Sequence, residues 1–247
     1  MLKIYAVLLF SCLFGLHAER ASLILMTEDY RPFQFRQSDG KLSGFAVELM
    51  REVFKDAKVE IRDKEIVMQA WARSYRVLQE DKNSALFMTT RNEKREKLFK
   101  WVGPIAPRAM WFYSLKKNKN IVIESKADLK KYRIGSVRGS ASTNNMIKQG
   151  LNLDLAVDDK SNMKKFLRGR FDLLAAIELS MNSKLQSHGM QYSDVKKHIL
   201  LNSDYSYYLA VNVAVPDDVV LELQKALDAM KEDGRYDKLY KSYLRSP

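Results

Sequence analysis

Cysteine is almost absent from the 247-residue sequence, and its one occurrence, Cys12, lies near the N-terminus. The residues around it have the organisation of a secretion signal: Lys3 is a positive n-region, residues 4–16 are a short apolar stretch, and Ala18 ends a small-residue exit. That apolar stretch is too short to span a bilayer, which takes about 20 residues. We therefore expect a signal peptide at residues 1–18. The exported chain would contain no thiol, which excludes thiol catalysis, disulfides and cysteine metal sites.

One alternative stays open at this cysteine. The tetrapeptide Leu9-Phe10-Ser11-Cys12 loosely resembles the attachment site of a lipoprotein. Phe10 fits that pattern poorly, and the apolar stretch continues past the cysteine through Phe14. A cleaved signal peptide is the favoured interpretation.

Histidine is nearly as scarce as cysteine, with three residues, and His17 belongs to the expected signal. His188 and His198 stand ten positions apart in a polar region without an H-x-x-x-H pattern, which makes a zinc site unexpected. The sequence also lacks the G-x-S-x-G elbow, the G-x-G-x-x-G turn and the G-x-x-x-x-G-K-[ST] loop. We expect no catalytic residue, no metal ligand and no cofactor.

The chain is basic, with 42 lysines and arginines against 30 acidic residues and a formal net charge of +12. Its lysine pairs are scattered and are not interleaved with aromatic residues. Proteins that bind single-stranded nucleic acid do interleave basic and aromatic residues. An exported chain also rarely meets nucleic acid. The charge therefore indicates only a mild attraction for anionic ligands. The pairs are Lys116-Lys117, Lys130-Lys131, Lys164-Lys165 and Lys196-Lys197.

Short apolar runs alternate with helical patterns along the rest of the chain. Such alternation predicts an α/β fold with largely parallel sheets. The chain is long enough for one large or two small domains, and its sequence contains no internal repeat or low-complexity linker. The runs that predict strands lie at residues 22–27, 85–88, 109–115, 132–137, 172–179 and 205–215; the helical patterns lie at 45–57, 70–80, 161–169, 216–233 and 236–243.

The strongest candidate site follows the apolar run at residues 85–88. The predicted strand ends at the hydroxyls of Thr89 and Thr90, and Asn92 can cap a short helix that carries Arg95 in its first turn. The N–H groups of a helix N-terminus favour an anion, and a guanidinium can add a planar bidentate pair to a carboxylate. The alternative is that Arg95 is a solvated side chain on a charged surface ladder. This stretch alone slightly favours that alternative.

A second turn of the same kind follows the predicted strand at residues 132–137. Gly139 permits an unusual backbone angle, and Ser140 or Ser142 can cap the helix that comes next. The sequence thus predicts two helix N-termini that each follow a strand.

Seven short motifs follow one another along the exported chain. They are Thr27-x-x-Tyr30-x-Pro32-Phe33; Asp39-Gly40-Lys41-Leu42-x-Gly44-Phe45; Trp71; Thr90-x-x-x-x-Arg95 with Trp101-x-x-Pro104; Ile134-Gly135-x-x-x-Gly139-Ser140; Gly169-Arg170-x-Asp172; and Asp233-Gly234-x-Tyr236-x-x-x-Tyr240. In this order and at this spacing they resemble the bacterial extracellular solute-binding proteins of family 3, the type II periplasmic receptors for polar amino acids.

The resemblance implies an α/β fold with two lobes, arranged as a clamshell with the ligand in the cleft. Lobe 1 would comprise residues 19–110 and 206–247, and lobe 2 residues 111–205. The two hinge crossings would fall at the aromatic runs 109–115 and 205–215. The resemblance also implies a periplasmic monomer that delivers its ligand to an inner-membrane ABC permease.

The resemblance also implies roles for individual residues. Arg95 would hold the ligand carboxylate, Thr90 would help to hold the amino group, and Tyr30 would stack on the ligand side chain. The turn at Ser140 would present backbone N–H groups to the same carboxylate, which reverses the preference for a solvated Arg95. Trp71 would either stack on the ligand or pack within lobe 1.

Three positions depart from the family pattern. Thr27 stands where many members have an acidic residue, and Ala141 stands where many have a hydroxyl, with Ser142 next. Ile177 occupies the usual position of the carboxylate that pairs with the ligand ammonium, and Glu178 follows it. A one-residue bulge would be needed to turn Glu178 inward. The expected ligand-binding residues are Tyr30, Trp71, Thr89, Thr90, Arg95, Ser140, Ser142 and Glu178.

The expected function is capture of a small carboxylate-bearing solute, such as a polar amino acid, by hinge closure for an ABC importer. Two alternatives stay open. One is an enzyme on the same fold, similar to the dehydratases that act on cyclic carboxylic acids, with Glu178 as its catalytic carboxylate. The other is a sensing protein that hands its ligand to a membrane receptor.

Overall fold

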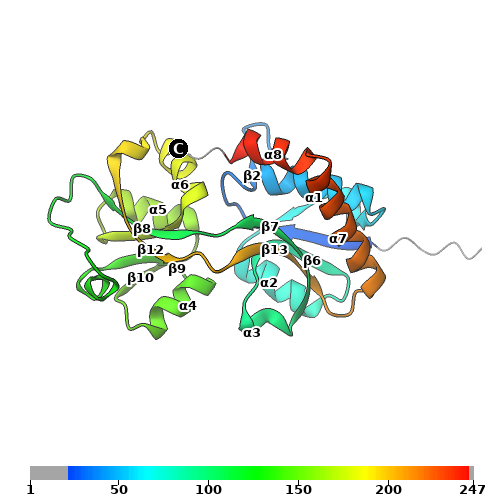
Figure 1. The fold of residues 1–247 in the computed structure, drawn as a ribbon, viewed down its shortest axis with the longest axis horizontal. Helices are drawn as coiled ribbons and strands as arrows, with labels where there is room; N and C mark the ends of the chain where they lie inside the picture. The colour runs from blue at the N-terminus through cyan, green and yellow to red at the C-terminus, as the bar shows by residue number, and fades with distance from the viewer. Residues whose placement is uncertain (1–21, 245–247) are drawn as a thin grey trace, which may run out of the picture.

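The computed structural model describes residues 22–244, and in them two sheets flanked by helices form two lobes that lie side by side (Figure 1). The expected signal peptide at residues 1–18, with Cys12 and His17, lies outside the described residues. Within the described part of the chain, no helix combines the length and the apolar character needed to cross a membrane.

Lobe 1 contains a six-stranded sheet in the order β4-β1-β6-β13-β7, with β5 also paired to β1. Its strands are β1 (Ser22–Thr27), β4 (Glu60–Ile61), β5 (Val67–Met68), β6 (Ser84–Thr90), β7 (Phe99–Pro107) and β13 (Ser206–Asn212). A small hairpin joins β2 (Phe35–Arg36) and β3 (Leu42–Ser43). The helices are α1 (Phe45–Asp56), α2 (Trp71–Glu80), α3 (Glu93–Glu96), α7 (Asp217–Glu232) and α8 (Arg235–Tyr243), with a 3-10 turn, η1 (Arg62–Lys64).

Lobe 2 contains a five-stranded sheet in the order β10-β9-β11-β8-β12. Its strands are β8 (Met110–Leu115), β9 (Ile134–Val137), β10 (Leu153–Ala156), β11 (Leu173–Ile177) and β12 (Val195–Asn202). Its helices are α4 (Ala141–Lys148), α5 (Asp159–Leu167) and α6 (Glu178–Gln186), with the 3-10 segments η2 (Lys126–Lys131) and η3 (Tyr192–Asp194).

Each sheet is mixed rather than largely parallel. The pairs β1–β6 and β9–β11 are parallel as expected, but β13 runs antiparallel to both β6 and β7, and β8 runs antiparallel to β11 and β12. The prediction of largely parallel sheets is therefore wrong for the strands next to the links between the lobes. In lobe 1 the chain leaves through β7 and returns through β13, and in lobe 2 it enters through β8 and leaves through β12. The two strands of each pair therefore run in opposite directions.

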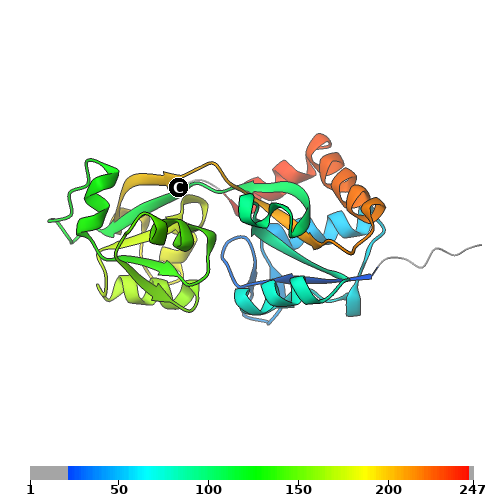
Figure 2. The ribbon, with the colours of Figure 1, turned by 90° about the horizontal axis from the view of Figure 1, so that it is seen from below.

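Two short links connect the lobes. The chain leaves β7 through Arg108 and Ala109 to enter β8, and it returns from β12 to β13 through residues 203–205. The N–H of Arg108 donates a hydrogen bond to the carbonyl oxygen of Tyr205 at 3.2 Å, which ties the links to each other. Figure 2 shows both links along one side of the molecule. Each predicted aromatic crossing thus begins in a link and continues as a strand of one lobe.

The core of lobe 1 fixes the position of the segments that face lobe 2. All seven residues of β6 are buried, as expected for a strand covered on both faces. The start of α1 lies over this core, where Phe45 packs edge-on against Tyr236 and Tyr240 of α8. These contacts hold the N-terminus of α1 in place.

The N-terminus of α1 anchors the loop between β1 and β2. The N–H of Phe45 donates to the carbonyl oxygen of Pro32 at 3.3 Å, and the N–H of Ala46 donates to that of Phe33 at 2.8 Å. The approach is close because Gly44 has no side chain: a Cβ at this residue, where φ is +120°, would lie 2.5 Å from the Phe33 carbonyl oxygen. The anchored loop carries Tyr30 toward lobe 2.

Candidate ligand-binding site

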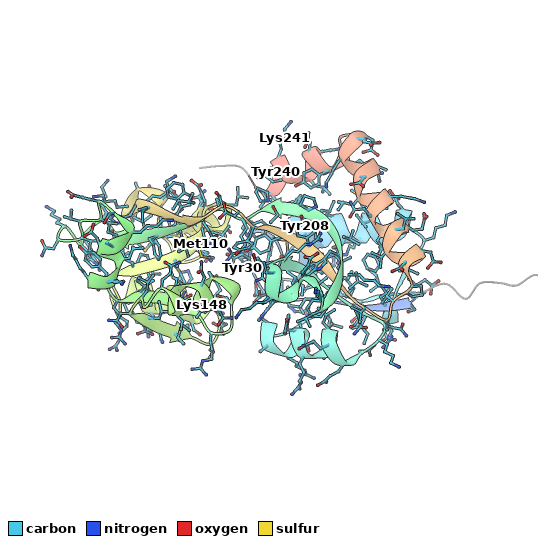
Figure 3. All side chains as sticks on the ribbon, turned by 60° about the horizontal axis from the view of Figure 1, so that its bottom comes forward. Tyr30, Met110, Lys148, Tyr208, Tyr240 and Lys241 are labelled. Carbon is cyan, nitrogen blue, oxygen red and sulfur yellow. The ribbon has the colours of Figure 1, made fainter. Side chains whose placement is uncertain are left out.

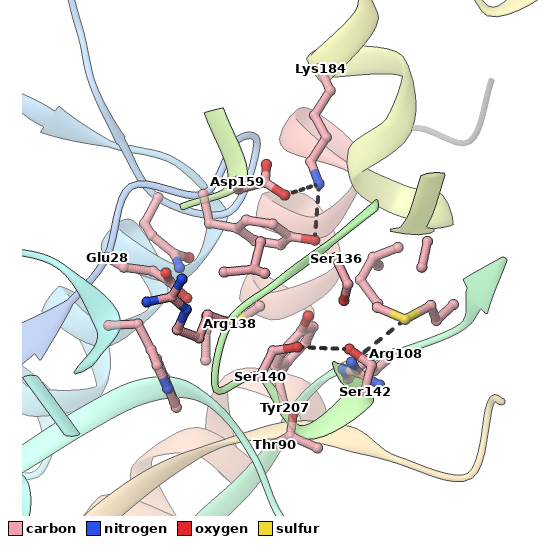
Figure 4. Close-up of a pocket in the computed structure, with 18 of the residues that line it drawn as sticks. Glu28, Thr90, Arg108, Ser136, Arg138, Ser140, Ser142, Asp159, Lys184 and Tyr207 are labelled. Atoms are coloured by element: carbon pink, nitrogen blue, oxygen red, sulfur yellow. Dashed lines mark hydrogen bonds and ion pairs between the residues drawn. The ribbon is translucent and has the colours of Figure 1, made fainter. Parts of the chain in front are cut away.

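A pocket of about 100 Å³ lies between the lobes, and both lobes contribute to its lining. Figure 3 places Tyr30 and Met110, which both line it, at the junction of the lobes, and Figure 4 shows the pocket in close-up. A pocket of this size has room for several water molecules or a small solute. Its lining from lobe 1 and the first link is Glu28, Tyr30, Gln34, Trp71, Met88, Thr90, Arg95, Tyr207 and Arg108; from lobe 2 it is Met110, Ser136, Val137, Arg138, Ser140, Ser142, Asp159, Ala175, Ile177 and Lys184.

Arg95 is buried in this pocket, with 8% of its surface exposed. As the sequence predicts, Asn92 caps α3: its side chain accepts a hydrogen bond from the Arg95 N–H at 3.1 Å. The guanidinium donates to the carbonyl oxygen of Thr90 at 3.1 Å and lies over the rings of Trp71 and Tyr75, 5.3 and 5.0 Å from their centroids. Within residues 22–244 no carboxylate pairs with it, and burial lowers its pKa. Arg95 is thus a positioned cation without an anion.

Arg108 is a second buried cation in the pocket, with 4% of its surface exposed. Its guanidinium lies 3.4 Å from the side-chain oxygen of Asn202 and 3.9 Å from the sulfur of Met110, and it lies 5.9 Å from the centroid of the Tyr207 ring. It has no carboxylate partner in the described part of the chain. A buried charge that has lost its partner typically costs about 3–5 kcal/mol. Two such arginines in one pocket indicate that an anion completes the site.

The turn before α4 brings hydroxyl groups to the opposite wall. Ser140 caps α4 as predicted, because its side chain accepts the N–H of Thr143 at 3.2 Å, and Gly139 before it has a φ of +74°. The hydroxyls of Ser140 and Ser142 lie 3.1 Å apart (Figure 4). The N-terminus of a helix attracts anions through its unpaired N–H groups. This wall therefore adds to the positive potential of the pocket.

Tyr30 forms the direct contact between the lobes. Its hydroxyl lies 3.2 Å from the hydroxyl of Ser180 and accepts a hydrogen bond from the ammonium of Lys184 at 3.4 Å. The same ammonium lies 4.5 Å from the centroid of the Tyr30 ring and pairs with Asp159 at 2.7 Å (Figure 4). Burial raises the pKa of Tyr30 well above its usual value, which keeps the phenol neutral. This contact holds the loop of lobe 1 against α5 and α6 of lobe 2.

Glu28 is the other acidic residue of the pocket. Burial raises the pKa of its carboxyl group to about 8; the charge of Asp159 also raises it, while Lys184 acts in the opposite direction. At neutral pH the carboxyl group is therefore mostly protonated. In that form it can donate a hydrogen bond, and it carries no negative charge.

This protonation makes stability depend on pH. The folded carboxyl keeps its proton up to about pH 8, whereas the unfolded one loses it near pH 4.5. The folded state binds more protons between these values, and the free energy of unfolding falls as pH rises. The contribution of Glu28 is complete below pH 4.5 and is lost as pH passes 8. We expect urea titrations from pH 5 to 9 to show this fall in the wild type but not in Glu28→Gln. Parallel profiles for the two proteins would contradict it.

The sequence of this two-lobe chain matches a known protein family. The model of the bacterial extracellular solute-binding proteins, family 3, matches residues 23–246. The chain belongs to this family. The L-cystine-binding protein TcyA of Bacillus subtilis (strain 168) is 25% identical over 220 residues, which cover 87% of this chain and 78% of the relative.

Solved structures share the fold of this family member. An ancestral arginine-binding protein bound to arginine is 24% identical, with a TM-score of 0.79 over 92% of this chain and 99% of the other. A histidine kinase sensor domain with similarity to periplasmic binding proteins is 16% identical, with a TM-score of 0.80 over 91% of this chain and 98% of the other. Both likenesses show the two-lobe periplasmic-binding fold of type II.

The pocket of this solute-binding protein contains most of the residues that the sequence singled out, and two of them lie elsewhere. Those that line it are Tyr30, Trp71, Thr90, Arg95, Ser140 and Ser142. Thr89 is fully buried, and its hydroxyl donates to the carbonyl oxygen of Leu86 at 3.0 Å instead of facing the pocket.

Glu178 is the second residue outside the pocket. The strand β11 ends at Ile177, earlier than predicted, and Glu178 opens α6, where its carboxylate pairs with Lys197 at 2.6 Å. Because Glu178 is helical, the one-residue bulge that would have been needed to turn it inward is not formed. Ile177 itself lines the pocket. The position that the resemblance associates with a carboxylate for the ligand ammonium is therefore apolar.

Sequence reasoning missed several lining residues that carry charge or polarity. Asp159 and Lys184 lie far apart in the sequence and meet only through the packing of α5 and α6. Gln34 is 1% exposed, and its side-chain oxygen has no hydrogen-bond partner within the described chain. Only Arg108 leaves a signal, because a lone arginine directly after Pro107 interrupts two apolar strand patterns at the place where the lobes connect.

Proposed function

We propose that this protein captures a small carboxylate-bearing solute, such as a polar amino acid, in the pocket between its lobes. One observation carries the proposal: the Arg95 guanidinium is buried in the pocket, held by Thr90 and two aromatic rings, and has no anion to pair with. A planar guanidinium matches a carboxylate through two parallel hydrogen bonds. The ligand would supply the missing charge.

Capture proceeds by closure of the lobes on the ligand. Arg95 belongs to lobe 1 and Ser140 to lobe 2, and both line the same pocket. A ligand that touches both walls binds the closed form more tightly than the open one and shifts the population toward closure. The contact of Tyr30 with Ser180 and Lys184 exists only while the lobes are together, and it adds to the stability of the closed form.

We further propose that the closed protein works in the periplasm as a monomer and delivers its ligand to an ABC importer of the inner membrane. Membership of an extracellular solute-binding family supports this destination. A sensing role would use the same closure to signal to a membrane receptor. Uptake of the labelled ligand by cells with and without the protein separates the two roles, because only the importer role predicts lost uptake.

Binding rather than catalysis is the activity that we propose. An enzyme of the dehydratase type would need a catalytic carboxylate in the pocket, and the residue considered for it, Glu178, pairs with Lys197 outside the pocket. Of the two acids that do line the pocket, Asp159 is paired with Lys184, and Glu28 is the one that a turnover assay tests. The curated relative is also a binding protein. We expect no turnover of prephenate or arogenate by the purified protein, as followed by product absorbance. Turnover that is lost in a pocket variant would contradict this assignment.

A thermal-shift screen tests the proposed function. The panel consists of amino acids, simple carboxylic acids and neutral sugars. A ligand at a hundredfold excess over its dissociation constant stabilises the folded state by about 2.7 kcal/mol. For a chain of this size that corresponds to a rise of roughly 5–10 °C in the melting temperature. We expect the rises to be confined to compounds with a carboxylate. A rise with sugars and none with any acid would overturn the proposal.

A further inference from the structure

We infer that the ligand carries two acidic groups: it is a short dicarboxylate, with or without an amino group, held by Arg95 at one end and by Arg108 at the other. This inference rests on the proposed function and deepens it by naming the class of ligand. It starts from the second buried guanidinium of the pocket, because Arg108, like Arg95, has no carboxylate partner among residues 22–244.

The two arginines are attached on opposite sides of one strand. Arg95 bonds to Thr90 of β6, and Thr90 pairs with Tyr207 of β13. On its other side Tyr207 pairs with Ala106 of β7, and Arg108 follows two residues later. Two strand spacings separate the backbones by about 10 Å. The Arg95 guanidinium is thus held at β6 and the backbone of Arg108 continues β7, on opposite sides of Tyr207, an arrangement that suits two acid groups joined by a short spacer.

The charge of the pocket points the same way. Arg108 is close enough to Arg95 to lower its pKa, although burial is the larger cause. One carboxylate would leave an excess of positive charge between them. Of the two acids that line the pocket, Asp159 is already paired with Lys184 at 2.7 Å. Glu28 is mostly protonated at neutral pH, as described above, and can donate a hydrogen bond to a ligand carboxylate.

Part of the pocket lining is apolar. Met88, Met110, Ala175 and Ile177 all line the pocket and offer no group that would hold an ammonium. Such a surface accepts the methylene groups of a spacer. The amide of Gln34, whose oxygen has no partner within the described chain, is a neutral group from lobe 1 that can contact an additional polar substituent.

Calorimetric titration with matched probes tests the inference. The probes are L-glutamate and L-glutamine, which have the same shape but differ by one acid group, together with succinate, glutarate, L-aspartate and L-arginine. We expect at least one dicarboxylate to bind, and L-glutamate to bind at least about tenfold more tightly than L-glutamine, since a charge-assisted contact is lost in the amide. L-Glutamine or L-arginine binding as tightly as every dicarboxylate would overturn the inference.

Arg108→Met isolates the second acid group. The variant keeps an unbranched apolar stem but removes the guanidinium and its charge, and we expect it to bring the affinity for the dicarboxylate down to that of its monocarboxylate analogue, whose own affinity stays unchanged. Arg108→Lys should recover part of the loss. Arg91→Met is the matched control, because Arg91 is partly exposed, lies outside the pocket lining and is paired with Glu96 at 2.6 Å, and it should change neither affinity. An equal loss for both probes in Arg108→Met would overturn the inference.

The outcomes separate this inference from the proposed function. If Arg95→Ala no longer binds any acid while L-glutamate and L-glutamine bind the wild type with equal affinity, the proposed function stands and only the inference of a second acid group is wrong. If Arg95→Ala binds acids as the wild type does, the proposed function fails. Binding of no carboxylate at all would contradict both. The apo melting temperature of Arg108→Met, which we expect to match or exceed that of the wild type, verifies that the variant folds.

Discussion

Arg95→Ala is expected to weaken carboxylate binding by at least about 100-fold while leaving the melting temperature of the apo protein nearly unchanged. A bidentate pair to a carboxylate consists of two charge-assisted hydrogen bonds, each worth roughly 1.5–3 kcal/mol. Loss of the pair is therefore worth about 3–6 kcal/mol, or two to four orders of magnitude in affinity. The apo protein loses the bond to the Thr90 carbonyl and the contacts with the rings of Trp71 and Tyr75, and this loss is offset because an uncompensated buried charge is removed.

Isothermal titration with the tightest acid from the screen measures this effect. Arg91→Ala is the matched control, because it removes the same charge only four residues away. Arg91 pairs with Glu96 and does not line the pocket. The affinity of Arg91→Ala for the acid should stay within about twofold of the wild type, because a partly exposed charge outside the pocket contributes little to binding. An Arg95→Ala protein that binds the acid normally would remove Arg95 from the account.

Gly44→Ala is expected to destabilise the protein by more than about 3 kcal/mol. The φ of +120° is a conformation in which a non-glycine residue is strained by about 1–3 kcal/mol. The new Cβ would also lie 2.5 Å from the carbonyl oxygen and 2.7 Å from the carbonyl carbon of Phe33. Those atoms belong to backbone and cannot move without breaking the hydrogen bond from Ala46 to Phe33. Urea unfolding at pH 7 measures the loss.

Gly40→Ala separates the strain from the clash. Gly40 also has a positive φ, +85°, but nothing lies within 4 Å of the position that its Cβ would take. We expect a loss of only about 1–2 kcal/mol there, the cost of a left-handed residue alone. Similar losses for both variants would show that the close approach between α1 and the β1–β2 loop is unimportant. Because that loop carries Tyr30, Gly44→Ala should also weaken ligand binding.

The predictions that held depend on local signals. Asn92 caps α3 and so fixes the turn that carries Arg95, and Ser140 caps α4 in the same way. Both are side chains bonding to backbone three residues away, which a short stretch of sequence determines by itself. The family motifs supplied the rest of the fold, because they fix the order and spacing of the elements around these caps.

Glu178 shows where local reasoning fails. Its apolar neighbours fit a strand, but β11 ends at Ile177 and the chain turns into α6, where Lys197 from β12 pairs with the carboxylate. Strand alternation then no longer describes where the side chain points. The end of β11 depends on its antiparallel pairing with β8 up to Met110, a contact between segments far apart in the sequence.

Arg108 and the Asp159–Lys184 pair depend on the tertiary structure in the same manner. The lone arginine after Pro107 marks the link in the sequence, but only the tertiary structure places it in the pocket beside Tyr207. The neutral state of Glu28 likewise follows from its burial close to Asp159, a residue of the other lobe. The charge balance of the pocket, and with it the class of ligand, could therefore be inferred only once the two lobes were placed together.

The most direct test of the account is a crystal structure of the protein with the tightest-binding acid from the screen. The account predicts a carboxylate between the lobes, bonded through two oxygens to the guanidinium of Arg95, with Tyr30 in contact with Ser180 and Lys184. An acid bound outside the pocket, or one whose carboxylates leave Arg95 without a partner, would contradict it.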